Sequence, residues 1–81
     1  MKLAALLACV ALSGCGASDG SVFTLYRTSA LDTQMRLHVA TFDANESAEY
    51  NSENCNTAMR LFQSQAGVTV RFWCEKGRFR R

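Results

Sequence analysis

Two cysteines in the second half of the chain, Cys55 and Cys74, most constrain what the chain can fold into. A helix from Cys55 to Ala66 would climb about 16 Å at ~1.5 Å per residue. A strand from Val68 back to Cys74 would return about 20 Å at ~3.3 Å per residue. If the chain reverses near Gly67, the two cysteines therefore lie at the same end of a helix and strand pair and can come close together.

The length of 81 residues supports one small domain and excludes a multidomain enzyme. A hydrophobic fraction of 48% is high enough for a folded core, so the chain is not a disordered tail. The net charge of +2 is too small for nucleic-acid binding through bulk charge.

Alternation of side-chain types predicts three β-strands, at residues 22–28, 35–42 and 68–74. A short polar connection at residues 29–34 joins the first two strands, which we expect to be antiparallel. In the second strand the alternation predicts two faces. One face holds Met35, Leu37, Val39 and Thr41, and the other holds Arg36, His38, Ala40 and Phe42.

A helix is predicted between the second and third strands, after a turn at residues 43–47. Asn51 or Ser52 is predicted to cap its N-terminus, and Gly67 to end it by supplying a left-handed residue. One apolar stripe recurs at helical spacing and consists of Cys55, Ala58, Met59, Phe62 and Ala66. The order ββαβ predicts a small two-layer α+β domain, with a three-stranded, mainly antiparallel sheet and the helix on one face.

The first residues have the organisation of an export signal. Lys2 supplies one positive charge, and residues 3–12 are all apolar. A helix needs about 20 residues to cross ~30 Å of hydrocarbon, so this run is too short for a permanent transmembrane span. It suits the apolar region of a signal peptide.

Four residues at the end of this run resemble the lipobox of bacterial lipoproteins, namely Leu12, Ser13, Gly14 and Cys15. The resemblance implies that diacylglycerol is attached to the Cys15 thiol and that the signal peptide, residues 1–14, is removed. Residues 15–21 would then be a lipidated, flexible tether, and residues 22–81 would be the folded domain.

The residues after Cys15 bear on the destination of the protein. Gly16, rather than Asp, follows Cys15. This resembles the pattern of enterobacterial lipoproteins that are exported to the outer membrane and face the periplasm. Several acyl chains on one residue, at ~0.8 kcal/mol per buried CH₂, would anchor the protein stably. The alternative is an ordinary secretory signal that is cut after Ala17 and discards Cys15.

Export would place the remaining cysteines in an oxidising compartment, where disulfides persist. Because Cys55 and Cys74 also lie on the faces assigned to the core, we expect a disulfide between them. Two alternatives stay open. Cys55 at a helix N-terminus could act as a nucleophile with His38, since the helix dipole favours the thiolate. Cys55, Cys74 and His38 could also bind a metal, although a fourth ligand is missing.

Charges are segregated along the chain. An acidic stretch without cations contains Asp43, Glu46, Glu49 and Glu53, whereas residues 71–81 hold five cations and one Glu. Interleaved aromatic and basic side chains suit anionic polymers, phosphates or lipid head groups. The candidate binding residues are Arg71, Trp73, Lys76, Arg78, Arg80 and Arg81.

The same segment has a simpler interpretation, in which its charges only solvate the last strand and keep the sheet edge from pairing. Trp73 is the more informative residue, because alternation places it with Arg71 and opposite Cys74. On an uncovered sheet face its ring needs a partner or cover from Tyr26 or Phe42.

The sequence lacks paired catalytic carboxylates, a Ser and His pair and a glycine loop that could cradle phosphate. We therefore expect no catalysis, no cofactor and no metal. A further resemblance, to small uncharacterised proteobacterial lipoproteins, implies no activity and is carried by Tyr50, Asn51, Asn54, Cys55 and residues 72–78.

These features predict a cell-envelope lipoprotein with a small binding or structural domain that faces the periplasm. The expected partners are the membrane, through the lipid anchor, and an envelope protein or an anionic envelope polymer, with no nucleic acid. One alternative is an inhibitor or blocker of another envelope protein, as small lipoproteins of phage exclusion and lysozyme inhibition are. A second alternative is a small enzyme that uses Cys55.

Overall fold

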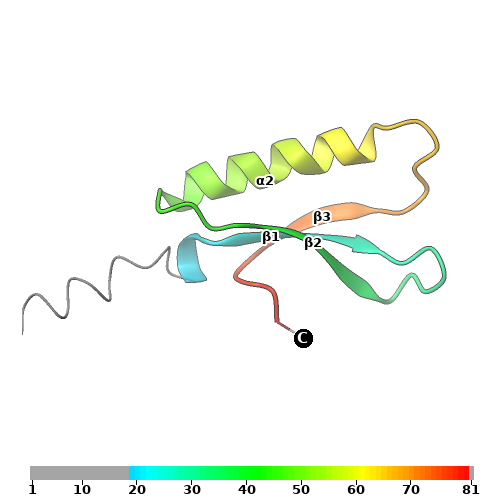
Figure 1. Ribbon diagram of the computed structural model, residues 1–81, viewed down its shortest axis with the longest axis horizontal. Coiled ribbons are helices and arrows are strands. Elements are labelled where there is room, and N and C mark those ends of the chain that lie inside the picture. The colour runs from blue at the N-terminus through cyan, green and yellow to red at the C-terminus, as the bar shows by residue number, and fades with distance from the viewer. Residues whose placement is uncertain (1–18, 81) are drawn as a thin grey trace, which may run out of the picture.

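The computed structural model describes residues 19–80, so Cys15 with its lipobox, and Arg81, lie outside the described residues. The elements are a 3₁₀ turn η1 (Asp19–Ser21), strands β1 (Phe23–Thr28) and β2 (Arg36–Phe42), helix α2 (Ala48–Gln63) and strand β3 (Phe72–Lys76). The predicted ββαβ order and the α+β class are confirmed, with α2 covering one face of the sheet (Figure 1).

The strands form one antiparallel sheet in the order β2-β1-β3. β1 is the central strand and carries the buried side chains of the sheet, among them Thr24, Leu25 and Tyr26. β2 and β3 are both edge strands, and neither contains a fully buried residue. The core therefore lies along β1 and extends on one side to α2 at Cys55.

The register between β1 and β2 slips by one residue at Val39. Leu25 pairs with Ala40, but Tyr26 pairs with His38, so Val39 is an extra residue on β2. An extra residue shifts the later side chains of a strand to the opposite faces, and the prediction of two continuous faces along β2 is therefore wrong. The helix side of β2 holds Leu37, Ala40 and Phe42, and the open side holds Arg36, His38 and Thr41.

Helix α2 begins one turn earlier than predicted. Ser47 is the N-cap, and its Oγ accepts a hydrogen bond from the Tyr50 N–H at 3.1 Å. Glu49 in the first turn complements the positive end of the helix dipole. Asn51 and Ser52 are thus not caps, because the local bond to Ser47 already satisfies the start of the helix.

The far end of α2 also differs from the prediction. The helix ends at Gln63 rather than Ala66, and β3 begins at Phe72 rather than Val68. The predicted reversal near Gly67 is present, and its φ of 84° is in the left-handed region that glycine tolerates. Residues 68–71 belong to the connecting loop, so the third strand is shorter than the alternation indicated.

Cys55 and Cys74 form the predicted disulfide, with 6.2 Å between their Cα atoms. Cys55 is fully buried, and Cys74 pairs with Leu25 in the sheet. One residue before the end of α2, Phe62 stacks on Phe72 with 5.4 Å between the ring centroids. The helix is therefore held to β3 by a covalent bond near its middle and by a ring pair near its end.

The folded domain includes Asp19–Ser21, which precede the predicted domain start at Val22. In η1 the carbonyl of Asp19 accepts a hydrogen bond from the Val22 N–H at 3.3 Å, and the Ser21 carbonyl accepts one from Asn51 at 2.7 Å. Residues 19–21, which the sequence analysis placed in the flexible tether, are thus packed against the domain.

Asn51 joins three segments through its buried side chain, which is 1% exposed. Its Oδ1 accepts from the Ala44 N–H at 3.1 Å, and its Nδ2 donates to the carbonyls of Ala44 at 3.1 Å and Ser21 at 2.7 Å. Buried amides need such partners, because an unpaired polar group away from water is costly. The side chain thereby docks the start of α2 onto η1 and onto the residue two beyond β2.

Loss of the disulfide is expected to lower the free energy of unfolding substantially. The cysteines are 19 residues apart in the chain, and on the chain-entropy model closing such a loop contributes about 3 kcal/mol. Denaturant unfolding of the oxidised protein and of the Cys55→Ser, Cys74→Ser double variant measures this difference. Thiol alkylation before and after reduction, with the labelled peptides identified by mass, reports the bond directly, and alkylation of Cys55 and Cys74 before reduction would contradict it.

Asn51→Ala is expected to destabilise the domain by about 3 kcal/mol, because it removes three partly buried hydrogen bonds to backbone groups, each worth ~1 kcal/mol. Asn54→Ala is the matched control. Its side chain also donates to a backbone carbonyl, that of Tyr50 at 2.9 Å, but it does so in an exposed position. Equal losses for the two variants in thermal or denaturant unfolding would show that Asn51 does not dock the helix.

Candidate functional site

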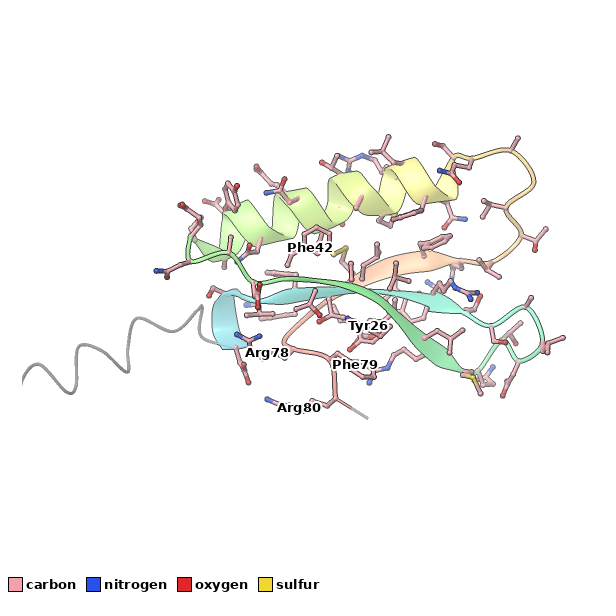
Figure 2. The ribbon with its side chains drawn as sticks, viewed as in Figure 1. Tyr26, Phe42, Arg78, Phe79 and Arg80 are labelled. Carbon is pink, nitrogen blue, oxygen red and sulfur yellow. A yellow bond between two sulfur atoms is a disulfide. The ribbon has the colours of Figure 1, made fainter. Side chains whose placement is uncertain are left out.

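A shallow groove of about 480 Å³ lies between α2 and the end of β2. Its strand side is formed by Thr41 and Phe42 together with Asp43 and Ala44, which follow β2. Figure 2 shows Phe42 between the sheet and α2, where the extra residue at Val39 has placed it. Without the shift in register, Phe42 would have pointed to the opposite face of the sheet, and this wall would have been missing.

The helix side of the groove is a stripe distinct from the one that packs on the sheet. Tyr50, Asn54, Ala58 and Leu61 line the groove and recur at spacings of four, four and three residues. Tyr50 is 49% exposed and Leu61 is 64% exposed. The sequence analysis assigned Ala58 to the core and missed the rest of the stripe, since Asn54 and Thr57 interrupt its apolar pattern.

Three glutamates form an acidic rim where α2 begins, whereas Arg60 precedes Leu61 at the other end of the groove. Glu49 and Glu53 directly precede Tyr50 and Asn54 on α2, and Glu46 precedes the helix cap. All three glutamates are exposed, and among residues 19–80 none of them forms an ion pair. Asp43 differs, because its Oδ2 accepts a hydrogen bond from Arg78 at 3.1 Å.

The two edges of the sheet are not equivalent. On β3, the Gln63 side chain donates to the Val70 carbonyl at 2.9 Å and accepts from the Phe72 N–H at 2.8 Å, so it occupies the start of this edge. On β2, by contrast, no backbone group has a hydrogen-bond partner outside the ladder with β1, as far as residues 19–80 are concerned. The groove therefore borders the free edge of the sheet.

The face of the sheet opposite α2 carries an aromatic cluster. Tyr26 stacks on Trp73 with 6.0 Å between ring centroids, so of the two covers predicted for Trp73 the structure uses Tyr26 and not Phe42. The guanidinium of Arg36 lies 4.3 Å from the Tyr26 ring centroid, and that of Arg71 lies 4.5 Å from the Trp73 ring centroid. The predicted common face of Arg71 and Trp73 is thus confirmed.

The segment after β3 folds back across this open face. Gly77, with φ of 107°, starts the reversal, and its carbonyl accepts a hydrogen bond from the Thr24 hydroxyl at 2.6 Å. Phe79 then stacks on His38 at 4.6 Å and lies 6.3 Å from Tyr26, on the side of the sheet away from Phe42 (Figure 2). This cover explains why Tyr26 is only 2% exposed.

The candidate basic residues fall into different places in the structure. Arg78 binds Asp19 and Asp43, each at 3.1 Å, and Arg80 binds Asp19 at 2.6 Å. These ion pairs, which we call the acid clasp, fasten the segment after β3 to η1 and to the end of β2. Arg71 lies apart over Trp73, Lys76 is exposed at the end of β3, and Arg81 lies outside the described residues.

The groups weighed for catalysis or metal binding are not brought together. Cys55 forms a disulfide with Cys74, whereas His38 lies on the opposite face of the sheet, where its Nε2 and the Thr41 Oγ1 share a hydrogen bond of 2.8 Å. Within residues 19–80 no cluster of His, Cys, Asp or Glu is suited to hold a metal ion.

The same stretch contains no helix whose length and apolar character would let it cross a membrane.

Comparison of the chain with protein-family models, with curated proteins and with solved structures finds no match. The functional argument therefore depends on the residues themselves.

Arg78→Gln is expected to loosen the acid clasp and to lower the free energy of unfolding by about 1 kcal/mol at low salt, since the partners are partly exposed and screened. The loss should shrink in 1 M salt, where the Debye length falls to about 3 Å. Arg60→Gln is the control, because Arg60 on α2 forms no ion pair within residues 19–80. Denaturant unfolding at both salt concentrations makes the comparison. A loss for Arg78→Gln that is no larger than for Arg60→Gln would contradict a stabilising clasp.

Proposed function

We propose that the chain is a lipid-anchored protein of the bacterial cell envelope, whose small domain binds another envelope protein through the groove between α2 and β2. The anchor is Cys15, on the resemblance of residues 12–15 to a lipobox. The domain faces the periplasm from the outer membrane. It recognises a partner and carries out no chemistry.

The disulfide is the observation that carries this proposal. A bond between Cys55 and Cys74 persists only in an oxidising compartment, and the periplasm is such a compartment. The same bond leaves neither of these thiols free to act as a nucleophile. It therefore supports export and argues against the alternative of a Cys55-dependent enzyme.

The distribution of charge favours an envelope protein over an anionic polymer as the partner. Arg78 and Arg80 are already paired with aspartates in the acid clasp, which reduces the positive charge available for a polyanion. The groove offers half-exposed apolar side chains with hydrogen-bonding groups nearby, a combination typical of protein-binding sites.

Two exposed apolar residues favour a special case of this function, an inhibitor or blocker. Leu31 in the loop between β1 and β2 is 98% exposed, and Met35 at the end of that loop is 48% exposed. Apolar side chains on a protruding loop suit insertion into a pocket of a target protein. In this version the loop, together with the groove, obstructs an envelope protein.

Lipidation is tested with the full chain expressed in a Gram-negative host. The wild-type protein should gain the mass of the diacylglycerol and acyl groups and should partition into detergent, whereas Cys15→Ser should do neither. Cys9→Ser is the matched control, because Cys9 lies in the segment that is removed and its loss should change nothing. A wild-type protein that is exported at its unmodified mass and stays in the aqueous phase would exclude the anchor.

The binding role is tested in the same cells with a photo-crosslinking residue in place of Leu61, which lines the groove. The same residue in place of Arg60, on the solvent side of α2, is the control. A discrete crosslinked envelope protein is expected at Leu61 and not at Arg60. A third variant carries the photo-crosslinking residue in place of Leu31. Crosslinks from this position alone would favour the loop between β1 and β2 as the binding element.

A further inference from the structure

We propose that the partner docks as an extended basic segment, which adds a strand to the free edge of β2 and places an apolar side chain in the groove that Tyr50 and Leu61 line. This inference rests on the binding role proposed above and specifies the chemistry of its partner. It is carried by the asymmetry of the sheet edges, by the apolar stripe of α2 and by the acidic rim.

The backbone of β2 supplies the first argument. Its seven residues make no backbone hydrogen bond beyond the ladder with β1 within the part of the chain that the structure describes. An open edge of this kind is a template for a further strand. The extra residue at Val39 breaks the regularity of the edge, and so the pairing segment is Ala40 to Asp43, next to the groove.

The start of the β3 edge is obstructed by a side chain, and this favours β2 as the edge to which a partner strand is added. Arg71 directs its backbone groups toward β1, because its carbonyl accepts from the Thr28 N–H at 3.0 Å and its N–H donates to the Thr28 hydroxyl at 3.1 Å. The neighbouring Val70 carbonyl and Phe72 N–H therefore point away from β1, and Gln63 binds both. The amide of Gln63 thus occupies the start of the β3 edge, where an added strand would have to pair.

The side chains around the groove supply the second argument. A strand laid along Ala40 to Asp43 would have its alternate side chains on the helix side, next to Phe42 and below Tyr50 and Leu61. The groove, of about 480 Å³, has room for an apolar anchor among these side chains. Tyr50 and Leu61 lie about 16 Å apart along α2 at ~1.5 Å per residue, so the docked segment as a whole, and not its anchor alone, would cover both of these exposed side chains.

The charge on the rim supplies the third argument and selects the kind of partner. Glu46, Glu49 and Glu53 have no ion-pair partner in the described chain and lie beside the apolar stripe. Lys or Arg on either side of the anchor would therefore meet unpaired negative charge. A second copy of this chain is disfavoured as the occupant, because pairing two β2 edges would bring two acidic rims together.

The test uses the mature protein purified in detergent and a pool of heptapeptides, Thr-Lys-Thr-Φ-Thr-Lys-Thr, in which Φ is Val, Leu, Phe or Tyr. This pattern places both Lys residues and the anchor on one face of a strand. One control pool has Glu in place of Lys. The other has N-methyl groups on alternate backbone amides, which removes the hydrogen bonds of an edge strand without altering the side chains.

The basic pool is expected to shift the amide NMR signals of Ala40 to Asp43 and of the helix stripe, and to slow hydrogen exchange on β2. Both control pools should bind at least about tenfold more weakly, a difference of ~1.4 kcal/mol. Affinity for the basic pool should fall as salt is raised.

Variants of the protein give the matching comparison. Leu61→Asp should weaken binding about tenfold or more. Ala66→Asp should leave binding unchanged, because it adds the same charge at an exposed apolar residue that does not line the groove. The Glu49→Gln, Glu53→Gln double variant should bind more weakly and with less dependence on salt. Fluorescence of Trp73, the single tryptophan, and the oxidised state of the cysteines confirm that each variant is folded.

Three results would overturn the proposal. They are no binding of the basic pool at millimolar concentration, equal binding of the N-methylated pool, and signal shifts confined to the open face around Tyr26 and Trp73. Shifts in β2 that depend on protein concentration without peptide would assign the edge to a second copy instead. If lipidation and the Leu61 crosslink hold while the basic pool fails, the envelope-binding function stands and only the strand mode is excluded.

Discussion

The bond between Cys55 and Cys74 joins the middle of the helix to an edge strand, and the remaining architecture is arranged around it. Two side-chain amides hold the helix on either side of this bond. Asn51 forms hydrogen bonds with the backbone of Ala44 and Ser21 at one end, and Gln63 forms one with the loop before β3 at the other. Because the helix is fixed at three points along its length, it cannot rotate to bury its second apolar stripe, and the groove beside β2 is kept open.

The two faces of the sheet are closed by different means. On one face, α2 covers Leu25 and Phe42. On the other, the segment after Gly77 folds back and places Phe79 against His38 and Tyr26. A three-stranded sheet with only one covered face would leave Tyr26 and Trp73 open to water, and the returning segment removes much of that exposure. The acid clasp then holds this segment in place. Arg78 and Arg80 therefore stabilise the fold and are already paired when a ligand arrives.

The functional surface that the structure supports differs from the one that the sequence suggested. The interleaved aromatic and basic residues at 71–81 suggested a binding edge, but their rings stack within the domain and two of their arginines are paired with aspartates. The unpaired charge in the described chain includes the three glutamates of the rim. The surface with free backbone groups, exposed apolar side chains and unpaired charge is therefore the one between α2 and β2.

The sequence by itself determined the features that depend on local pattern. Period-two alternation located the strands, the helical stripe located α2, and the matched lengths around Gly67 predicted the disulfide between Cys55 and Cys74. Tertiary structure decided what depends on contacts between distant segments. The register shift at Val39, which moves Phe42 to the helix side, is set by pairing with β1 and has no signal within β2 itself. Asn51 was taken for a helix cap because both roles use the same amide chemistry, and only the approach of Ala44 and Ser21 distinguishes them. The partners of Arg78 and Arg80 lie 35 to 61 residues away in the chain, so no local pattern could show that these charges were already neutralised.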